Sequence, residues 1–458
     1  MKWFPRSMAV VLALSAVAQA DVTPRKLYED VTPSLVAVQF QFAGETINRE
    51  LVGPGIVVGD DGLVMTPLAL FNVQLPDEQL KDFKILIPSQ DKDVEEVEAV
   101  FVGRDERSNV AFVRAKEKHD WKPLKFDTSK PDVGETVYSV GLLPKSAAYK
   151  SYLLKSSISA HLRGEVPQEL VDTGLAAAGS PVFNADGKAI GMVNQGPTLF
   201  LNLGDDERDM QSVTQPPKFF TPASDFISSL SDPPIAGEPQ KLPWMGIPNL
   251  RGLDKDVAEA FKLTNQPAVE IGEVLPNTPA AKAGLKQGNI IVKVNGKPLE
   301  RPDEPKELPG IIGRLFRRMK VGDKVTLSIL PAPGEPMKDV DVTLEEMPMR
   351  ANRAKRFYAE DLGFVAREMV FNDTYRQHMP ADSKGVVVAL IKPSGAAETA
   401  KLQNFDVITQ LNGKPVTDLE QFKADYEAFR KDKPREAVVL VVVRRYPSTE
   451  SIRIEPPQ

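Results

Sequence analysis

The chain has 458 residues, about three times the usual length of a domain, which indicates a multidomain protein. Its 63 acidic residues outnumber the 57 basic ones, and the resulting net charge of −6 argues against nucleic acid as a partner. The lack of cysteine excludes disulfides, thiolate metal sites and a cysteine nucleophile. The three histidines lack carboxylates at ligand spacing, so we expect neither a metal nor another cofactor.

The amino terminus has the pattern of a signal peptide for export. A basic start precedes an apolar run over 8–17, which ends in the small-x-small pattern Ala-Gln-Ala at 18–20. This run is too short for a membrane span, which needs about 20 apolar residues. We therefore expect residues 1–20 to be cleaved before Asp21. The mature protein is then exported, to the periplasm or out of the cell, and has no membrane span.

Residues 21–232 have the pattern of a β-rich domain. The first alternating run, over 34–42, places apolar side chains on one face. Similar short runs, separated by glycine and proline, follow at 55–58, 63–66, 84–88, 97–102, 110–114, 136–140, 157–160, 181–184 and 189–193. Such a series of strands is typical of a barrel or a sandwich. We expect a closing helix over 221–230 and a linker at 231–234.

An internal repeat fills the rest of the chain. Its two copies share apolar and turn residues at a constant offset of 117 positions, which predicts two copies of one domain over 233–349 and 350–458. The shared positions are Pro276, Ala280, Ala283, Leu285, Ile291 and 295–298 in the first copy, and Pro393, Ala397, Ala400, Leu402, Ile408 and 412–415 in the second. Each copy predicts a short alanine-rich helix, a strand and an Asn-Gly turn. The stretch 331–349 is expected to be a proline-rich tail and linker.

The repeated motif, Pro-x-x-Pro-Ala-x-x-Ala-Gly-Leu followed by Gly-Asn-Ile-Ile and Val-Asn-Gly, resembles a bacterial PDZ domain. Upstream of each copy lies a candidate peptide-binding loop, made of Trp244, Met245, Gly246 and Ile247 in the first copy and of Asp361, Leu362, Gly363 and Phe364 in the second. The glycine lets successive backbone N–H groups converge on a peptide carboxylate. The apolar neighbours favour an apolar last side chain, and the peptide would add to the sheet edge as a strand.

Two PDZ domains behind a signal peptide and a β-rich domain resemble the HtrA family, the Do-like or DegP-like serine proteases. The stretches 51–66, 102–113 and 179–191 are similar to three motifs of that family's protease domain. The resemblance implies a mainly β fold, with a trypsin-like double β-barrel over 21–232 followed by the two PDZ domains.

The positions that match the family's catalytic histidine, aspartate and serine hold Ala69, Asn109 and Ala178. In such a triad the histidine takes the serine proton while the aspartate fixes its tautomer, and losing the unit costs about 10⁶-fold in turnover. Ala176 also replaces a glycine that helps to aim the two N–H groups of the oxyanion hole. The resemblance therefore implies a pseudoprotease without catalytic residues.

An active endopeptidase with an unconventional or misassigned site is the alternative. Ser180 lies two residues from the nucleophile position, but it would need a base within about 3 Å. His119 and His161 do not match the base position and are interpreted as surface histidines, and His378 belongs to the second PDZ copy. The sequence favours the inactive form.

The predicted function is peptide binding. The PDZ grooves would capture carboxyl-terminal or unfolded segments of exported proteins, which makes the protein a scaffold, chaperone or regulator in envelope quality control. The resemblance implies a homo-oligomer, a trimer in active relatives, or an assembly with an active relative. A third hypothesis is a structural envelope protein whose PDZ domains are only spacers.

Overall fold

The computed structural model of the chain describes residues 22–456 except 72–75, 90–92, 165, 195–199, 203–209, 213–218, 237, 239, 265, 303–304, 381 and 435–436. The predicted signal peptide and its cleavage point therefore lie outside the described residues. Among the residues that are described, no helix is both long and apolar enough to cross a membrane.

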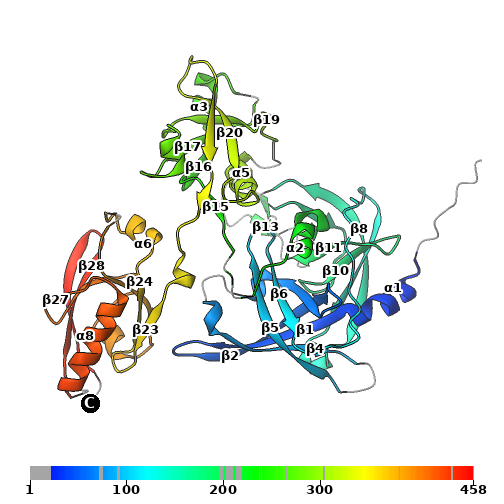
Figure 1. Cartoon of the computed structure of the whole chain (residues 1–458). Coiled ribbons are helices and arrows are strands. Elements are labelled where there is room, and N and C mark those ends of the chain that lie inside the picture. Colours follow the sequence, from blue (N-terminus) through cyan, green and yellow to red (C-terminus); the bar gives the residue numbers. More distant parts are fainter. Residues whose placement is uncertain are drawn as a thin grey trace, which may run out of the picture.

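Six strands close the first barrel in the order β1-β2-β3-β6-β5-β4 (Figure 1). They are β1 (Leu35–Ala43), β2 (Asn48–Val57), β3 (Leu63–Pro67), β4 (Leu80–Ile87), β5 (Glu95–Asp105) and β6 (Val110–Ala115). Alternation places apolar side chains inside, where the ring of Phe40 stacks on Phe71 at 4.9 Å and on Phe83 at 5.1 Å. Three buried rings thus fill one end of the barrel core.

The second barrel has the order β10-β11-β14-β9-β8-β7. Its strands are β7 (Thr136–Leu142), β8 (Ser151–Leu162), β9 (Gln168–Val171), β10 (Pro181–Asn184), β11 (Ala189–Asn194) and β14 (Phe219–Pro222), while β12 (Phe200–Asn202) and β13 (Met210–Ser212) pair with each other. Helix α1 (Pro24–Val31), capped by the Thr23 hydroxyl, packs Leu27 and Val31 against this barrel. The expected trypsin-like double barrel is confirmed.

The expected closing helix over 221–230 is wrong in its first half. Thr221 pairs with Met192 in β14, and the 3₁₀ turn η6 (Ala223–Asp225) separates this strand from helix α2 (Ile227–Ser231). Proline at 222 disfavours helical backbone at the preceding Thr221, and its own ψ of 147° is extended. The helix therefore begins later than the polar residues Thr221 and Ser224 suggested.

The other 3₁₀ turns given for the described residues are η1 (Thr32–Ser34), η2 (Leu68–Leu70), η3 (Asp77–Gln79), η4 (Lys145–Ala147), η7 (Pro305–Glu307) and η8 (Ala351–Arg353).

The first PDZ domain is built on the sheet β16-β17-β18-β20-β21. Its elements are β15 (Pro243–Trp244), β16 (Asn249–Gly252), α3 (Lys255–Ala260), β17 (Val269–Glu273), α4 (Pro279–Lys282), β18 (Ile290–Val294), β19 (Lys297–Pro298), α5 (Leu308–Arg317), β20 (Lys324–Leu330), β21 (Lys338–Thr343) and β22 (Glu345–Glu346). The prediction of a tail and linker over 331–349 is wrong, because β21 pairs with β20 and buries Val340 and Val342. The sequence analysis missed β21 because its valines alternate with aspartates for only a few residues and the stretch around them is rich in proline.

The second PDZ domain has the order β23-β24-β25-β26-β28-β29. Its elements are β23 (Arg356–Ala359), β24 (Phe364–Glu368), α6 (Phe371–Arg376), β25 (Val386–Ile391), α7 (Ala396–Thr399), β26 (Val407–Leu411), β27 (Lys414–Pro415), α8 (Leu419–Asp432), β28 (Val439–Arg445) and β29 (Ser448–Ile454). Both Asn-Gly turns are confirmed, since Asn295 and Asn412 have φ values of 50° and 49° and the following glycines are also left-handed.

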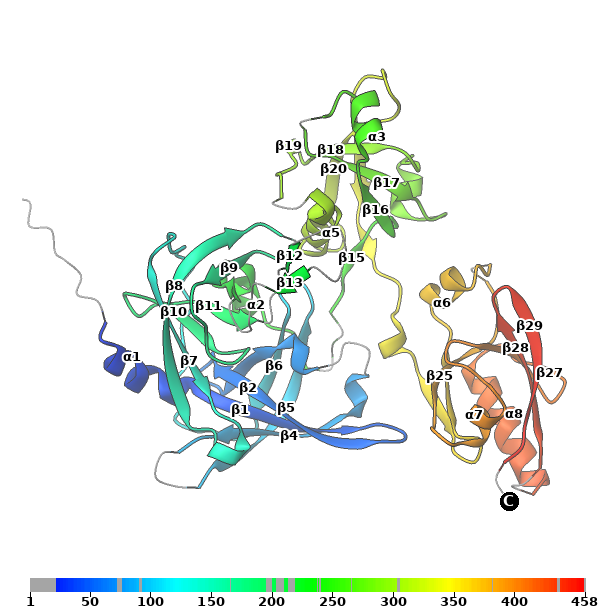
Figure 2. The same cartoon turned by 180° about the vertical axis from the view of Figure 1, so that it is seen from behind.

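The PDZ domains contact the barrels at different places (Figures 1 and 2). Helix α5 of the first PDZ domain places Arg314 at 2.7 Å from the Asp225 carboxylate, which is buried at the end of the second barrel. The β1–β2 hairpin of the first barrel reaches to the second PDZ domain, where Glu45 lies 3.5 Å from Arg356. Each PDZ domain is therefore tied to the double barrel by an ion pair.

Candidate functional site

The segments that hold the three positions compared with a serine-protease triad, 69, 109 and 178, adjoin where the two barrels join. The N–H of Leu68, in the turn that carries Ala69, donates to the Asn109 carbonyl at 3.1 Å. On the second barrel, Gly179, the residue after Ala178, packs closely against Pro67, which directly precedes that turn. A Cβ at Gly179 would lie 2.6 Å from Pro67 Cγ. Gly179 also has a φ of 91°, so glycine is needed here. Three segments that are far apart in the sequence are therefore neighbours in the structure.

These three side chains have little capacity for acyl transfer. Ala69 and Ala178 present methyl groups, which can neither attack a carbonyl nor accept a proton. The Asn109 amide is exposed and cannot carry the negative charge that stabilises an imidazolium.

The backbone next to Ala178 is also occupied internally. The N–H of Ala176 donates to the Ser139 hydroxyl at 2.8 Å, and both residues are fully buried. The N–H of Ala177 donates to the Tyr152 hydroxyl, also at 2.8 Å. An oxyanion would have to displace the serine to use the first of these donors. Sequence reasoning missed Ser139 and Tyr152, because they come from neighbouring strands and match no motif.

Ser180, the alternative nucleophile, is enclosed. Its side chain is buried against Gly141, where an added Cβ would lie 2.7 Å from the serine Oγ. Among the described residues its hydroxyl has no hydrogen-bond partner, and hence no base at the distance that activation requires. Its carbonyl accepts the Val193 N–H at 2.8 Å, which fixes the backbone in the second barrel.

Two of the three histidines lie away from this meeting point. The ring of His119 packs on Trp121 at 4.9 Å, and the ring of His378 packs on Tyr446 at 4.6 Å in the second PDZ domain. His161 differs from its interpretation as a plain surface residue. Its Nδ1 contacts the carboxylate of Glu169, whose side chain is only 3% exposed. A buried carboxylate orients this imidazole, which is the arrangement of a histidine base and its partner.

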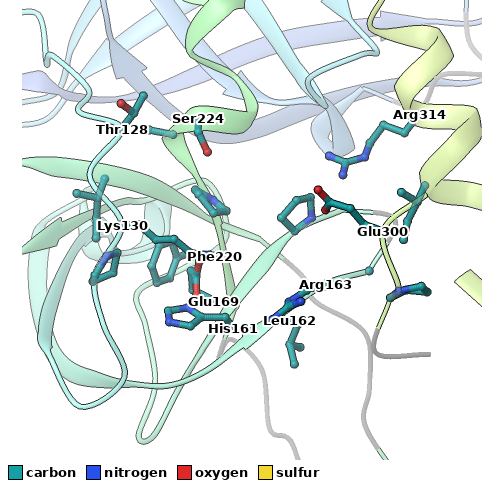
Figure 3. A pocket seen from close by; sticks show the side chains of 18 of the residues that line it. Thr128, Lys130, His161, Leu162, Arg163, Glu169, Phe220, Ser224, Glu300 and Arg314 are labelled. Carbon is teal, nitrogen blue, oxygen red and sulfur yellow. Dashed lines mark hydrogen bonds and ion pairs between the residues drawn. The ribbon is translucent and has the colours of Figure 1, made fainter. Parts of the chain in front are cut away.

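The His161–Glu169 pair lines a cavity of about 510 Å³ between the second barrel and the first PDZ domain (Figure 3). Figure 3 shows His161 and Glu169 on the barrel side, and Glu300 and Arg314 on the PDZ side. The cavity wall is part apolar and part polar, and its charged side chains carry both signs. No group of His, Asp and Glu that could hold a metal ion occurs among the described residues.

The first predicted peptide loop is shaped around its glycine. Gly246 has a φ of 87°, and a Cβ there would lie 2.2 Å from the Cβ of Thr278, so any side chain would displace the loop. Met245 is buried and Ile247 is half-buried beside it. Trp244 packs edge-on against Phe371 of the second PDZ domain, with ring centroids 5.7 Å apart. The loop of one PDZ domain thus contacts the other domain.

The second loop repeats the backbone geometry of the first at the same offset of 117. The N–H of Lys392 donates to the Gly363 carbonyl at 2.8 Å, as that of Leu275 does to Gly246 at 3.0 Å. Leu362 and Phe364 are fully buried in the domain core. Each loop therefore has a left-handed glycine whose carbonyl accepts an equivalent backbone hydrogen bond.

The Asp361 carboxylate of the second loop is paired within the domain. It lies 2.6 Å from the Arg430 guanidinium and accepts a hydrogen bond from the Tyr426 hydroxyl. Both partners come from helix α8. Sequence reasoning did not identify Arg430 or Tyr426, because the orientation of α8 depends on the packing of the whole domain.

Comparisons with known families match the three folded parts of the chain. A trypsin-like peptidase domain matches residues 53–192, and PDZ domains match residues 270–308 and 359–442. DegP-like periplasmic serine endoproteases are similar along most of the chain. That of Marinomonas sp. is 26% identical over 412 residues, covering 87% of this chain and 78% of the relative. That of Hahella chejuensis is 27% identical over 412 residues, with coverages of 86% and 78%.

Solved structures show the same fold at lower sequence identity. The HtrA-type protease AlgW with a decapeptide superposes with a TM-score of 0.51 at 14% identity, covering 72% of this chain and 100% of the other. AlgW with a tripeptide gives a TM-score of 0.51 at 15% identity, with coverages of 71% and 97%. These superpositions agree with a double barrel followed by a PDZ domain.

Proposed function

Because this chain is a homologue of the DegP/HtrA serine endoproteases, with a trypsin-like peptidase domain and two PDZ domains, we propose that it is a periplasmic pseudoprotease that binds peptides. The observation that carries the proposal is that the segments holding Ala69, Asn109 and Ala178 adjoin where the barrels join. A second observation supports it: the Ala176 N–H, which stands at an oxyanion-hole position by family resemblance, is already bonded to Ser139. Loss of the triad removes about 10⁶-fold of turnover, which leaves binding as the activity of the fold.

Peptide binding is assigned to the loops around Gly246 and Gly363. Each combines a left-handed glycine with apolar neighbours, an arrangement suited to turning loop N–H groups toward a carboxylate. In the second loop the Gly363 N–H donates to the Ala359 carbonyl at 2.9 Å, so a peptide would have to replace that contact. The ligands are peptides or unfolded exported proteins with free carboxyl termini and an apolar last residue. Holding such segments makes the protein a scaffold, chaperone or regulator in envelope quality control. It acts as a homo-oligomer, a trimer by family resemblance, or in assembly with an active relative.

The alternative function, an endopeptidase with an unconventional site, has one observation in its favour. The contact between His161 and the buried Glu169 supplies a base and its orienting carboxylate inside a cavity of about 510 Å³. A nucleophile is still required within about 3 Å of the imidazole.

Proteolysis distinguishes the two functions. Residues 21–458 are incubated with unfolded casein, and new chain termini are sought by mass spectrometry, beside Ser180→Ala and His161→Ala. An active HtrA-type protease, diluted about 10⁴-fold, sets the required sensitivity. We expect no cleavage by any of the three chains. Cleavage that disappears in either variant would establish the unconventional endopeptidase and refute the pseudoprotease.

Binding is tested with a fluorescein-labelled decapeptide that ends in phenylalanine, with either a free or an amidated carboxyl terminus. We expect the free form to bind at least tenfold more tightly, because the amide removes the charge that the loop N–H groups recognise. Equal affinity for the two forms would favour the spacer hypothesis or a different binding mode.

A further inference from the structure

The two PDZ domains differ at the sheet edge where a peptide would add. In the first, β16 pairs with β17 alone and forms the edge of the sheet, while β15 turns away to pair with β22. In the second, β23 pairs antiparallel with β24, the strand that follows the loop. The register runs from Arg356 opposite Arg367 to Ala359 opposite Phe364. The chain itself therefore occupies the strand position that a peptide takes in such a domain.

The side chains of β23 also fill the groove between β24 and helix α8. The ring of Phe357 lies 5.6 Å from that of Tyr426 and 6.2 Å from that of Phe422, both edge-on. The ammonium of Lys423 lies 5.9 Å from the centre of the same ring. Ala359, at the loop end of the strand, is fully buried. Phe357 thus takes the place of a ligand side chain against the helix.

Residues at equivalent positions of the two PDZ domains are buried to different extents, in line with the presence of β23 beside β24 in the second domain. Val365 and Ala366 of β24 are fully buried, whereas Pro248 and Asn249, their counterparts 117 residues earlier, are exposed and half-buried. The two domains share the repeat and the hydrogen bond to the glycine carbonyl of the loop, but in the second domain the Gly363 N–H also donates to the carbonyl of Ala359, the last residue of β23, at 2.9 Å. The added cover of β24 accompanies its pairing with β23.

Ion pairs lie near both ends of strand β23, which lies where a bound peptide would add to the sheet. The guanidinium of Arg430, near the loop, is paired at 2.6 Å with the carboxylate of Asp361, so a carboxylate of the chain already lies beside this cation. At the other end of β23, Arg356 lies 3.5 Å from Glu45, at the tip of the β1–β2 hairpin, with side-chain exposures of 20% and 16%. Figure 2 shows this hairpin reaching from the first barrel toward the second PDZ domain. The peptidase-like domain therefore holds the outer end of the strand.

We propose that Arg356–Ala359 is an internal ligand of the second PDZ groove, held in place by Glu45 of the first barrel. Only the first groove then takes peptide in the resting chain, and the second opens when the hairpin releases the strand. This inference rests on the proposed peptide binding, and it makes the β1–β2 hairpin the control element of the second groove.

The test uses the full mature chain and a labelled octapeptide with the sequence of residues 352–359 and a free terminal carboxylate. Gly246→Val closes the first groove in every sample, so that binding reports the second groove. We expect this background to bind weakly, and addition of Glu45→Lys or Phe357→Asp to raise the affinity at least tenfold. Gly363→Val should abolish the gain. Lys355→Glu, an exposed neighbour of the strand, is the matched control and should give none.

Two results would overturn the inference. Tight binding by the Gly246→Val background would mean that the second groove is already open. Failure of both release variants to bind, while the unmodified chain binds a peptide at its first groove, would mean that β23 does not control the second. If no chain binds any peptide, the proposed function fails, and the position of the strand is decided by a separate measurement.

That measurement is a disulfide, which the cysteine-free chain allows. Tyr358 and Val365 lie opposite each other in the register, so Tyr358→Cys with Val365→Cys should cross-link on oxidation. The matched pair in the first domain, Lys241→Cys with Pro248→Cys, should not, because β15 pairs elsewhere. The first disulfide should also abolish the binding gained through Glu45→Lys. Absence of that cross-link would refute the internal ligand, whatever the peptides do.

Discussion

Arg367 of strand β24 and Asp373 of helix α6 form a buried ion pair in the second PDZ domain, and its removal should destabilise that domain strongly. The guanidinium donates two hydrogen bonds of 2.6 Å to the carboxylate, and the two side chains are 3% and 6% exposed. The carboxylate also accepts the Val370 N–H at 2.8 Å at the start of helix α6. Removal of either partner therefore leaves a desolvated charge without its counter-charge.

The expected losses follow from this geometry. Arg367→Met and Asp373→Leu should each lower the free energy of unfolding of the domain by about 3–5 kcal/mol. The double variant leaves the Val370 N–H without its acceptor and the Glu368 carbonyl without the 2.9 Å hydrogen bond from Arg367, which together cost about 2–4 kcal/mol. The sum of the two single losses should therefore exceed the double loss by at least about 2 kcal/mol. Arg453→Met is the control, since its 2.9 Å pair with Glu455 is exposed and should contribute less than about 1 kcal/mol.

Hydrogen exchange of the amides in β26 and β28, followed by mass spectrometry on the full chain, measures the opening of this one domain. It does not require the three domains to unfold together. Losses that add in the double variant to within about 0.5 kcal/mol would refute the reasoning, because uncoupled residues behave in that way.

Three further predictions concern the barrels. Asp225→Ala removes the carboxylate that holds helix α5, so the first PDZ domain should separate and the radius of gyration from X-ray scattering should rise; an unchanged profile would contradict the docking. Ser139→Ala should cost about 1–3 kcal/mol in denaturant unfolding because it leaves a buried amide without its acceptor, whereas Ser180→Ala, whose hydroxyl has no partner among the described residues, should cost less than about 1 kcal/mol. Hydrogen bonds from the Ser156 hydroxyl and from backbone N–H groups lower the pKa of Asp172 to about 2. Because the pKa is lower in the folded than in the unfolded chain, the ionised carboxylate stabilises the fold above about pH 4, and this stabilisation is lost as the pH falls toward 2. Asp172→Asn should therefore flatten the acid side of the curve of unfolding free energy against pH. An unchanged acid side would contradict this.

Local pattern was sufficient to predict the strands that alternate clearly. The run over 34–42 became β1 (Leu35–Ala43), and both Asn-Gly turns formed where the repeat placed them. Strand β21 was missed, because its two buried valines lie among aspartates next to a proline-rich stretch. Its partner β20 buries the valine face, and this pairing cannot be read from the segment alone.

The candidate site was predictable only where residue type alone decides the chemistry. An alanine has no nucleophile or base in any fold, so Ala69 and Ala178 could be judged from their places in the motifs. The contact between His161 and Glu169 could not, because two strands must pair before these side chains meet. The same holds for the bond between Ser139 and the Ala176 N–H.

By itself the sequence determined the repeated domain, the alternation of the barrel strands and the residue types at positions 69, 109 and 178. These features depend on residue type and on the local spacing of apolar residues, which can be read without knowing the residues that each segment contacts after folding. Only the tertiary structure decided which strand each segment joins. The segments before the two peptide loops occupy equivalent places in the repeat, yet β15 pairs with β22 whereas β23 pairs with β24. Strand pairing depends on burial against other elements, here Phe357 against α8 and Arg356 against Glu45, and these contacts exist only once the chain has folded.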